Sequence, residues 1–257
     1  MPLRHLLFAA SIGLGLPALA CAQAPQSVQP EVVATYPHDP EAFTQGLFMH
    51  EGELFESTGQ VGRSSLRQVD LESGNVVRSA TIDPPYFGEG SARVGDEIFM
   101  LSWVSETGFV FDAETFEQIE TVSYPGEGWG LTFDGTHLIL SDGSPQLRLI
   151  DPEDFTLAGT IDVTLNGRPV RRLNELEWID GEIWANVWQT RIIVRIDPAS
   201  GEVIGLVDLT SLVPDGLNGS RDAVANGIAW NAATGQIYVT GKLWPVLYEI
   251  RLPDGGG

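Results

Sequence analysis

Cysteine and histidine are scarce in this chain. Cys21 is the only cysteine among 257 residues, so disulfides, cysteine metal sites and cysteine nucleophiles are excluded from the folded part. Of the four histidines, His5 stands near the N-terminus, and His38, His50 and His137 lack any short ligand spacing. We therefore predict no dedicated catalytic zinc. A calcium site made of carboxylates and carbonyl oxygens stays open in so acidic a chain.

Positive charge is also scarce. Lys and Arg total 14 against 35 Asp and Glu, which gives a formal net charge of -21 at pH 7. Such a charge repels nucleic acid and anionic lipid, so neither is an expected partner. The acidic excess is typical of a solvated surface. Lys242 is the only lysine, beside 13 arginines, and this makes its position informative.

Long apolar runs are absent after residue 24, where nothing approaches the roughly 18 uninterrupted apolar residues of a membrane-spanning helix. Residues 1–24 have Arg4 and His5 before an apolar stretch from Leu6 to Leu19, then an Ala22-Gln23-Ala24 cleavage pattern. This is typical of a secretory signal peptide. We predict an exported protein, periplasmic or secreted, with no membrane span. Cleavage after Ala24 and lipidation at Cys21 are alternatives that the sequence leaves open.

Nucleotide-binding loops and nucleophile elbows are missing too. What the chain does contain is short runs of Val, Ile, Leu, Phe, Trp and Thr between Gly, Asp, Asn and Pro turns. An apolar strand ending in Asp recurs about every 40 to 45 residues, at Asp70, Asp112, Asp151 and Asp197. Such repeats, with four short strands each, are typical of propeller blades. We predict an all-β fold, a five-bladed β-propeller.

The two chain ends are expected to close this ring. The fifth repeat runs out of chain near Leu252, before its outermost strand. Residues 31–36 can supply that strand from the other end of the chain, which would protect the open edges. The predicted organisation is a signal peptide at 1–24, a linker at 25–30 and a single propeller domain at 31–257.

A second repeated feature marks the start of each innermost strand. A large or polar residue precedes a glycine or its counterpart in all five units, at Gln45, Glu89, Trp129, Glu175 and Asn226. Packing alone favours small or apolar residues near a propeller axis. Polar groups at these equivalent places should therefore converge on one mouth of the central channel.

The segments around these positions resemble one family. They read FTQGL (43–47), FGEG (87–90), GWGL (128–131), LNELE (173–177), ANVW (185–188) and NGIAW (226–230). In order and spacing they are similar to the plant- and bacterial-type glutaminyl-peptide cyclotransferases, or glutaminyl cyclases, which are five-bladed propellers. The resemblance implies an acyltransferase that converts the N-terminal glutamine of peptides or proteins to pyroglutamate and releases ammonia. We expect a monomer without a cofactor.

That chemistry assigns roles to the motif residues. The substrate amine must lose a proton before it attacks its own γ-carboxamide, and the departing nitrogen must gain one, so a single carboxylate can serve both steps. The resemblance implies Glu89 for this role. Charge developing on the carboxamide oxygen needs a fixed donor, for which Lys242, Gln45 and Asn174 are candidates. The expected aromatic wall of the pocket is Phe43, Phe87, Trp103, Trp129 and Trp188.

Two other functions stay open. A metal-dependent lactonase-like propeller would arrange Glu89, Asn174 and Asn226 around an axial divalent ion, although it would normally have six blades and only five are countable here. A non-catalytic periplasmic binding propeller would use the same polar residues for recognition only. Fold alone cannot decide between an enzyme and a binding protein.

Overall fold

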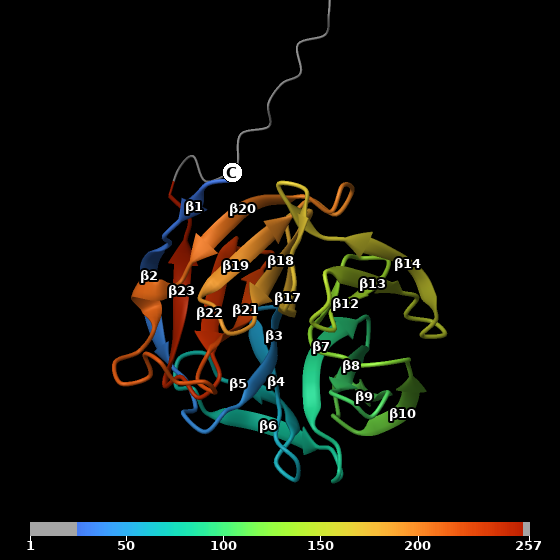
Figure 1. Cartoon of the computed structure of the whole chain (residues 1–257). Coiled ribbons are helices and arrows are strands. Elements are labelled where there is room, and N and C mark those ends of the chain that lie inside the picture. Colours follow the sequence, from blue (N-terminus) through green and yellow to red (C-terminus); the bar gives the residue numbers. More distant parts are fainter. Residues whose placement is uncertain (1–24, 254–257) are drawn as a thin grey trace, which may run out of the picture.

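The computed structural model describes residues 25–253, and nearly all of its regular structure is β-strand. Five sheets stand around a common axis, with β3, β7, β17 and β21 near the centre and β6, β10 and β14 at the periphery (Figure 1). Four of them have four antiparallel strands, and the fifth has one additional short parallel strand. These sheets confirm the predicted five-bladed propeller. The predicted signal peptide and Cys21 lie outside the described residues. None of the described residues forms a helix long and apolar enough to cross a membrane.

Blades 1 to 4 are each built from four consecutive strands, ordered from the axis outward. Blade 1 contains β3 (Thr44–His50), β4 (Glu53–Thr58), β5 (Ser65–Val69) and β6 (Val76–Thr81). Blade 2 contains β7 (Gly88–Val94), β8 (Glu97–Ser102), β9 (Thr107–Asp112) and β10 (Gln118–Ser123). Blade 3 contains β11 (Leu131–Phe133), β12 (Leu138–Leu140), β13 (Gln146–Ile150) and β14 (Leu157–Asp162).

Blade 5 takes its outermost strand from the N-terminal part of the described chain. Blade 4 contains β17 (Leu173–Ile179), β18 (Glu182–Val187), β19 (Ile192–Ile196) and β20 (Val203–Asp208). Blade 5 contains β21 (Ala225–Asn231), β22 (Gln236–Gly241), β23 (Val246–Arg251) and, outermost, β2 (Glu31–Pro37). Between blades lie the hairpin of β15 (Thr164–Leu165) and β16 (Arg168–Pro169) and the short 3-10 helix η1 (Thr210–Leu212).

The ring closes through β2, as predicted. This N-terminal strand pairs antiparallel with β23, from Glu31 opposite Arg251 to Pro37 opposite Val246. Residues 25–30, predicted as a linker, include β1 (Ser27–Val28), which pairs in parallel with β20 of blade 4. A two-residue strand is too short to show a periodic pattern, so it could not be predicted from the sequence. The N-terminal segment therefore contacts both blade 4 and blade 5.

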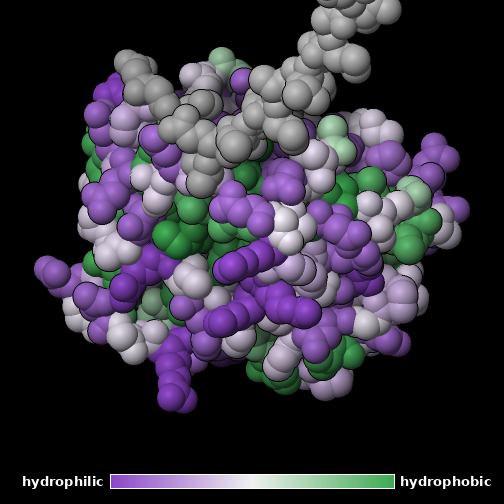
Figure 2. Space-filling view, turned by 45° about the horizontal axis from the view of Figure 1, so that its top comes forward, coloured by the Kyte–Doolittle hydropathy of each residue, from purple (hydrophilic) through white to green (hydrophobic). Residues whose placement is uncertain are grey.

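Burial follows the distance from the axis. The first five residues of β3 are buried, whereas β6 alternates between exposed and partly buried residues. Between blades 1 and 2 the core includes Phe55, Met100 and Phe111. Burying one such side chain contributes about 1.5–3 kcal/mol. Figure 2 shows that the face turned toward the viewer is mainly hydrophilic, with hydrophobic residues in small separate patches.

The recurring Asp residues close the turn between the two outer strands of their blades. The Oδ1 atom of Asp70 accepts the backbone N–H of Ser73 at 2.9 Å, and Oδ1 of Asp112 accepts that of Thr115 at 2.7 Å. This is the turn-stabilising bond that Asp side chains make with backbone groups two or three residues ahead. The repeat that revealed the blades is therefore a turn motif and not part of the site.

The innermost strands carry β-bulges at corresponding places. Pairing shifts between Thr44 and Gly46 in β3, between Gly88 and Ser91 in β7, between Leu173 and Leu176 in β17, and between Ala225 and Ile228 in β21. A bulge turns a side chain away from the regular alternation of a strand. Four polar residues occupy the same place in these bulges: Gln45, Glu89, Asn174 and Asn226.

In blade 4 this register corrects the sequence interpretation. Asn174, not Glu175, corresponds to Gln45 and Glu89. Glu175 stands where other blades have a glycine such as Gly90, and the motif was misaligned by one residue because the marker glycine is missing. The Glu175 side chain reaches toward blade 1, where its Oε1 accepts the backbone N–H of Leu47 at 3.2 Å.

Close contact between innermost strands explains Gly130 and gives a stability prediction. A Cβ atom on Gly130 would lie 2.0 Å from the backbone oxygen of Asn174. We expect Gly130→Ala to cost about 1–3 kcal/mol, as overpacked sites do, and to lower Tm by several degrees. On the outer strand β14, a Cβ on Gly159 would approach no atom closer than 3.6 Å. Gly159→Ala is therefore the control, and equal melting curves for both variants in circular dichroism would contradict the packing argument.

Candidate active site

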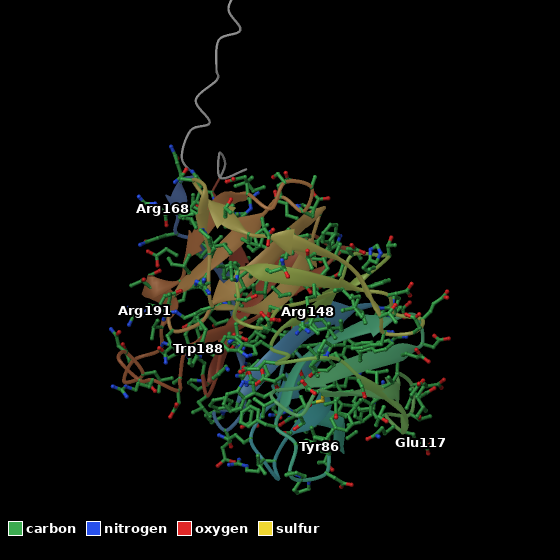
Figure 3. All side chains as sticks on the ribbon, turned by 45° about the vertical axis from the view of Figure 1, so that its right-hand side comes forward. Tyr86, Glu117, Arg148, Arg168, Trp188 and Arg191 are labelled. Atoms are coloured by element: carbon green, nitrogen blue, oxygen red, sulfur yellow. The ribbon has the colours of Figure 1, made fainter. Side chains whose placement is uncertain are left out.

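One cavity of about 270 Å³ opens where the innermost strands begin. All nine residues predicted for the site line it. They are Phe43, Gln45, Phe87, Glu89, Trp103, Trp129, Asn174, Trp188 and Lys242. In Figure 3, Trp188 lies well inside the molecular outline, whereas Glu117, in the turn before β10, lies at the outer edge. The fold thus brings together residues that are far apart in the sequence.

Three of these residues share a second structural position, directly after the second strand of their blade. The backbone N–H of Trp103 donates to the carbonyl of Phe87 at 2.9 Å. The backbone N–H groups of Trp188 and Lys242 make the same bond to the residues just before β17 and β21, at 2.8 and 2.9 Å. The cavity is therefore built from two sets of equivalent positions, one in or before the innermost strands and one after the second strands.

Glu89 lies at the base of this cavity. It is 5% exposed, and its Oε1 accepts a hydrogen bond from Nε2 of Gln45 at 3.0 Å. The Gln45 Oε1 in turn lies 3.5 Å from Nδ2 of Asn226, which donates to it. Burial raises the pKa of Glu89 well above its usual range, although the nearby Lys242 ammonium opposes this shift. Such a carboxyl group keeps its proton at a higher pH than an exposed one does.

Lys242 is as deeply buried as Glu89, with 5% of its surface exposed. Its Nζ lies 4.8 Å from the centre of the Phe43 ring, a distance typical of a cation–π contact. Burial lowers the pKa of Lys242 to about 8, and the charges of Glu89 and Asp222 limit this decrease. The cavity therefore holds a weak acid and a weak base whose protonation states depend on each other.

Aromatic rings form the walls. Phe43 and Phe87 meet edge to face with their ring centres 6.0 Å apart, and Phe87 meets Trp103 in the same way at 5.9 Å. On the other side, Trp129 and Trp188 are in edge-to-face contact at 5.5 Å. Edge-to-face packing holds the rings in fixed orientations. The result is a mainly apolar cavity with a few polar groups in its lining.

Comparison with known proteins identifies the family. The family model described as glutamine cyclotransferase matches residues 6–252, which is most of the chain. The chain belongs to the glutamine cyclotransferase family. A glutaminyl-peptide cyclotransferase from Arabidopsis thaliana is 45% identical over 226 residues, covering 86% of this chain and 71% of the relative.

Solved structures agree with this assignment. The crystal structure of Myxococcus xanthus glutaminyl cyclase matches with a TM-score of 0.82 and 39% identity, covering 89% of this chain and 98% of the other. The WD40 β-propeller domain of Doa1 matches with a TM-score of 0.50 and 12% identity, covering 82% of this chain and 64% of the other. The second likeness concerns the fold alone.

Three residues of this glutamine cyclotransferase fold contribute to the site without having been predicted. Oε2 of Glu127 accepts the indole N–H of Trp103 at 2.7 Å and that of Trp129 at 2.8 Å, so it fixes two wall residues. Its position directly before the GWGL motif was an available signal. Arg221 and Asp222 line the cavity from the loop between η1 and β21. Nothing in that polar loop sequence marks them.

Proposed function

We propose that this chain converts the N-terminal glutamine of peptides to pyroglutamate, with Glu89 as the proton shuttle and Lys242 as the donor to the developing oxyanion. The observation that carries these roles is a buried carboxyl and a buried ammonium lining the same small aromatic cavity. Membership in the glutamine cyclotransferase family supports the reaction. The substrate class follows from the reaction, because a free α-amine and the side-chain carboxamide of an N-terminal glutamine can close a five-membered lactam.

Glu89 accepts and returns the proton that the reaction transfers. The substrate α-nitrogen attacks the carbon of its own side-chain carboxamide, and a C–N bond forms while the Glu89 carboxylate takes one proton from that nitrogen. The bond to the amide nitrogen then breaks, Glu89 returns the proton, and ammonia leaves. The raised pKa of Glu89 brings it closer to that of a peptide α-amine, which is about 7.7–8.0. A proton can then pass in either direction at small cost.

Lys242 acts on the oxygen of the same carboxamide. During ring closure this oxygen gains negative charge, and an ammonium donor fixed in a water-poor cavity stabilises it. Asn174 and Gln45 stand beside it as further polar groups of the cavity. The rings of Phe43, Phe87, Trp103, Trp129 and Trp188 keep bulk water out and leave a flat space that suits a carboxamide and a five-membered lactam.

An ammonia-release assay tests this function. We expect ammonia and a product lighter by one ammonia from a glutamine-initiated peptide, and neither from the same peptide with an acetylated amine. Activity should persist with a chelator present. A metal-dependent lactonase would instead hydrolyse lactones and lose activity with the chelator, and a binding propeller would retain the peptide without releasing ammonia. Either result would contradict the proposal.

Export is a separate part of the proposal, supported by the signal-like pattern of residues 1–24. Mass spectrometry of protein purified from an exporting host should show a chain that begins at Pro25, if cleavage follows Ala24, or a lipid-bearing Cys21. An intact chain that still carries its leader would contradict export.

A further inference from the structure

A buried histidine lies outside the cavity, beside residues that hold the polar groups of the cavity in place. His38 directly follows the closing strand β2 and is 6% exposed. Its Nδ1 lies 2.6 Å from the backbone oxygen of Trp244, and its Nε2 lies 3.1 Å from Oε1 of Glu56. Both partners are hydrogen-bond acceptors, whereas a neutral imidazole carries only one N–H. The two bonds together require the doubly protonated ring.

The surrounding charges favour this state. Glu56 is 1% exposed, and its Oε2 forms an ion pair with Nε of Arg67 at 3.3 Å. A terminal nitrogen of Arg67 donates to Oδ2 of Asp39 at 2.8 Å. Burial disfavours the charged ring and the Arg67 charge also opposes it. Glu56 and the hydrogen bond to the Trp244 carbonyl together outweigh both, and the pKa of His38 lies above its ordinary value. His38 and Arg67 in turn hold the pKa of Glu56 below its usual range despite burial.

The first link from His38 runs to Lys242. Trp244 belongs to the turn after β22 that carries Lys242, and the residue between them, Leu243, has a φ of 61°. This left-handed conformation is costly for a leucine and persists only where neighbours hold it. The Leu243 N–H donates to the carbonyl of Ala42 at 2.7 Å, and the His38 ring holds the Trp244 carbonyl. His38 is thus one of the fixed points of the Lys242 turn.

The second link runs to Glu89. The Glu56 Oε1 that faces His38 also accepts the hydroxyl of Thr44 at 2.7 Å. Thr44 opens β3 and directly precedes Gln45, whose side-chain amide donates to Oε1 of Glu89. One imidazolium therefore connects the supports of both groups that the proposed reaction uses, although it contacts neither.

We propose that His38 is a positioning residue, which in its doubly protonated form holds the Lys242 turn and, through Glu56 and Thr44, the strand that presents Gln45 to Glu89. This inference deepens the proposed function and rests on it. Loss of one ring proton would remove one of the two hydrogen bonds and loosen one support. The consequence is a lower kcat with little change in KM, since His38 does not touch the substrate.

The protonation state is testable without any activity measurement. In the folded protein labelled with 15N-histidine, both ring nitrogens of His38 should give protonated signals at pH 7, assigned by their disappearance in His38→Gln. His50, whose pKa burial lowers, should be neutral at that pH. A neutral His38 ring at pH 7 would overturn the proposal. A doubly protonated ring in a protein without cyclase activity would leave the geometry standing and remove the proposed function instead.

Kinetics test the positioning role. His38→Gln should lower kcat about 10-fold or more, since small displacements of reacting groups cost up to about 100-fold, and KM should change less than about twofold. His50→Gln, at the far end of β3, is the matched control and should retain wild-type kinetics. If His38→Gln does not fold, Thr44→Val removes one link alone, with a smaller loss expected in kcat only. A folded His38→Gln protein with unchanged kcat, or equal losses in kcat and substrate affinity, would contradict the role.

Discussion

Glu89→Gln should lower kcat by about 10²–10⁴-fold, the usual contribution of a positioned acid/base group. Glutamine has the same shape as glutamate but can neither take the proton from the attacking amine nor return it to the leaving nitrogen. The variant side chain can still accept the hydrogen bond from Nε2 of Gln45 through its own Oε1. KM should therefore change little, and steady-state ammonia release over a range of peptide concentrations separates the two parameters.

Glu175→Gln provides the matched control. Glu175 is also a buried glutamate on an innermost strand, with a pKa that burial raises well above the usual range. It does not line the cavity, and its Oε1 accepts a backbone N–H, which glutamine can also do. We expect its kcat to stay close to that of the wild type. Equal losses in the two variants would show that Glu89 matters only as a buried carboxyl and would refute its role as proton shuttle.

Glu89→Gln should also make the protein more stable at neutral pH. A carboxyl whose pKa is raised by folding binds a proton more tightly in the folded state, so its contribution to stability falls as pH rises above the unfolded value. Glutamine has no such dependence. Glu89→Gln should therefore gain in Tm relative to the wild type between about pH 5 and 8, and a gain that disappears toward pH 4 would identify Glu89 as a group held at a cost in stability.

Much of the molecule could be predicted from its sequence because the propeller repeats itself. Asp turns at regular intervals indicated the blades, and the short N-terminal run indicated the closing strand. The bulge residues Gln45 and Glu89 stood before glycines and were found for that reason. In blade 4 the prediction was wrong by one residue, because Glu175 replaces the glycine that marks the position elsewhere. Local patterns locate a site only as precisely as their marker residue.

Long-range contacts set the limit of that approach. His38 and Trp244 are 206 positions apart, and their hydrogen bond exists only because the two chain ends share blade 5. The sequence showed His38 merely as a histidine without a ligand spacing. Arg221 and Asp222 reach the cavity from an irregular loop, and an irregular loop has no period that would predict where its side chains lie. Such residues can be recognised only from the three-dimensional structure of the closed propeller.

Lys242→Met should lower kcat by about 10²–10³-fold, the usual effect of removing one oxyanion donor. It should also move the acidic limb of the pH profile upward, because the Lys242 ammonium lowers the pKa of Glu89 and methionine carries no charge. Both effects follow from the loss of one buried cation, so they should appear together. A loss of kcat with an unmoved acidic limb would contradict the electrostatic coupling of the two groups.

Lys242→Arg separates charge from shape. In the wild type the ammonium loses its proton as pH rises through about 8, so its donation to the oxyanion is present below that pH and lost above it. Arginine stays charged throughout this range. Titration of the substrate amine affects both proteins equally, so it cancels when the kcat of Lys242→Arg is divided by the kcat of the wild type. That ratio should start below one, because the guanidinium does not fit a space shaped for an ammonium, and rise through about pH 8. A ratio independent of pH would show that the proton on Lys242 has no part in the reaction, whatever its position in the cavity.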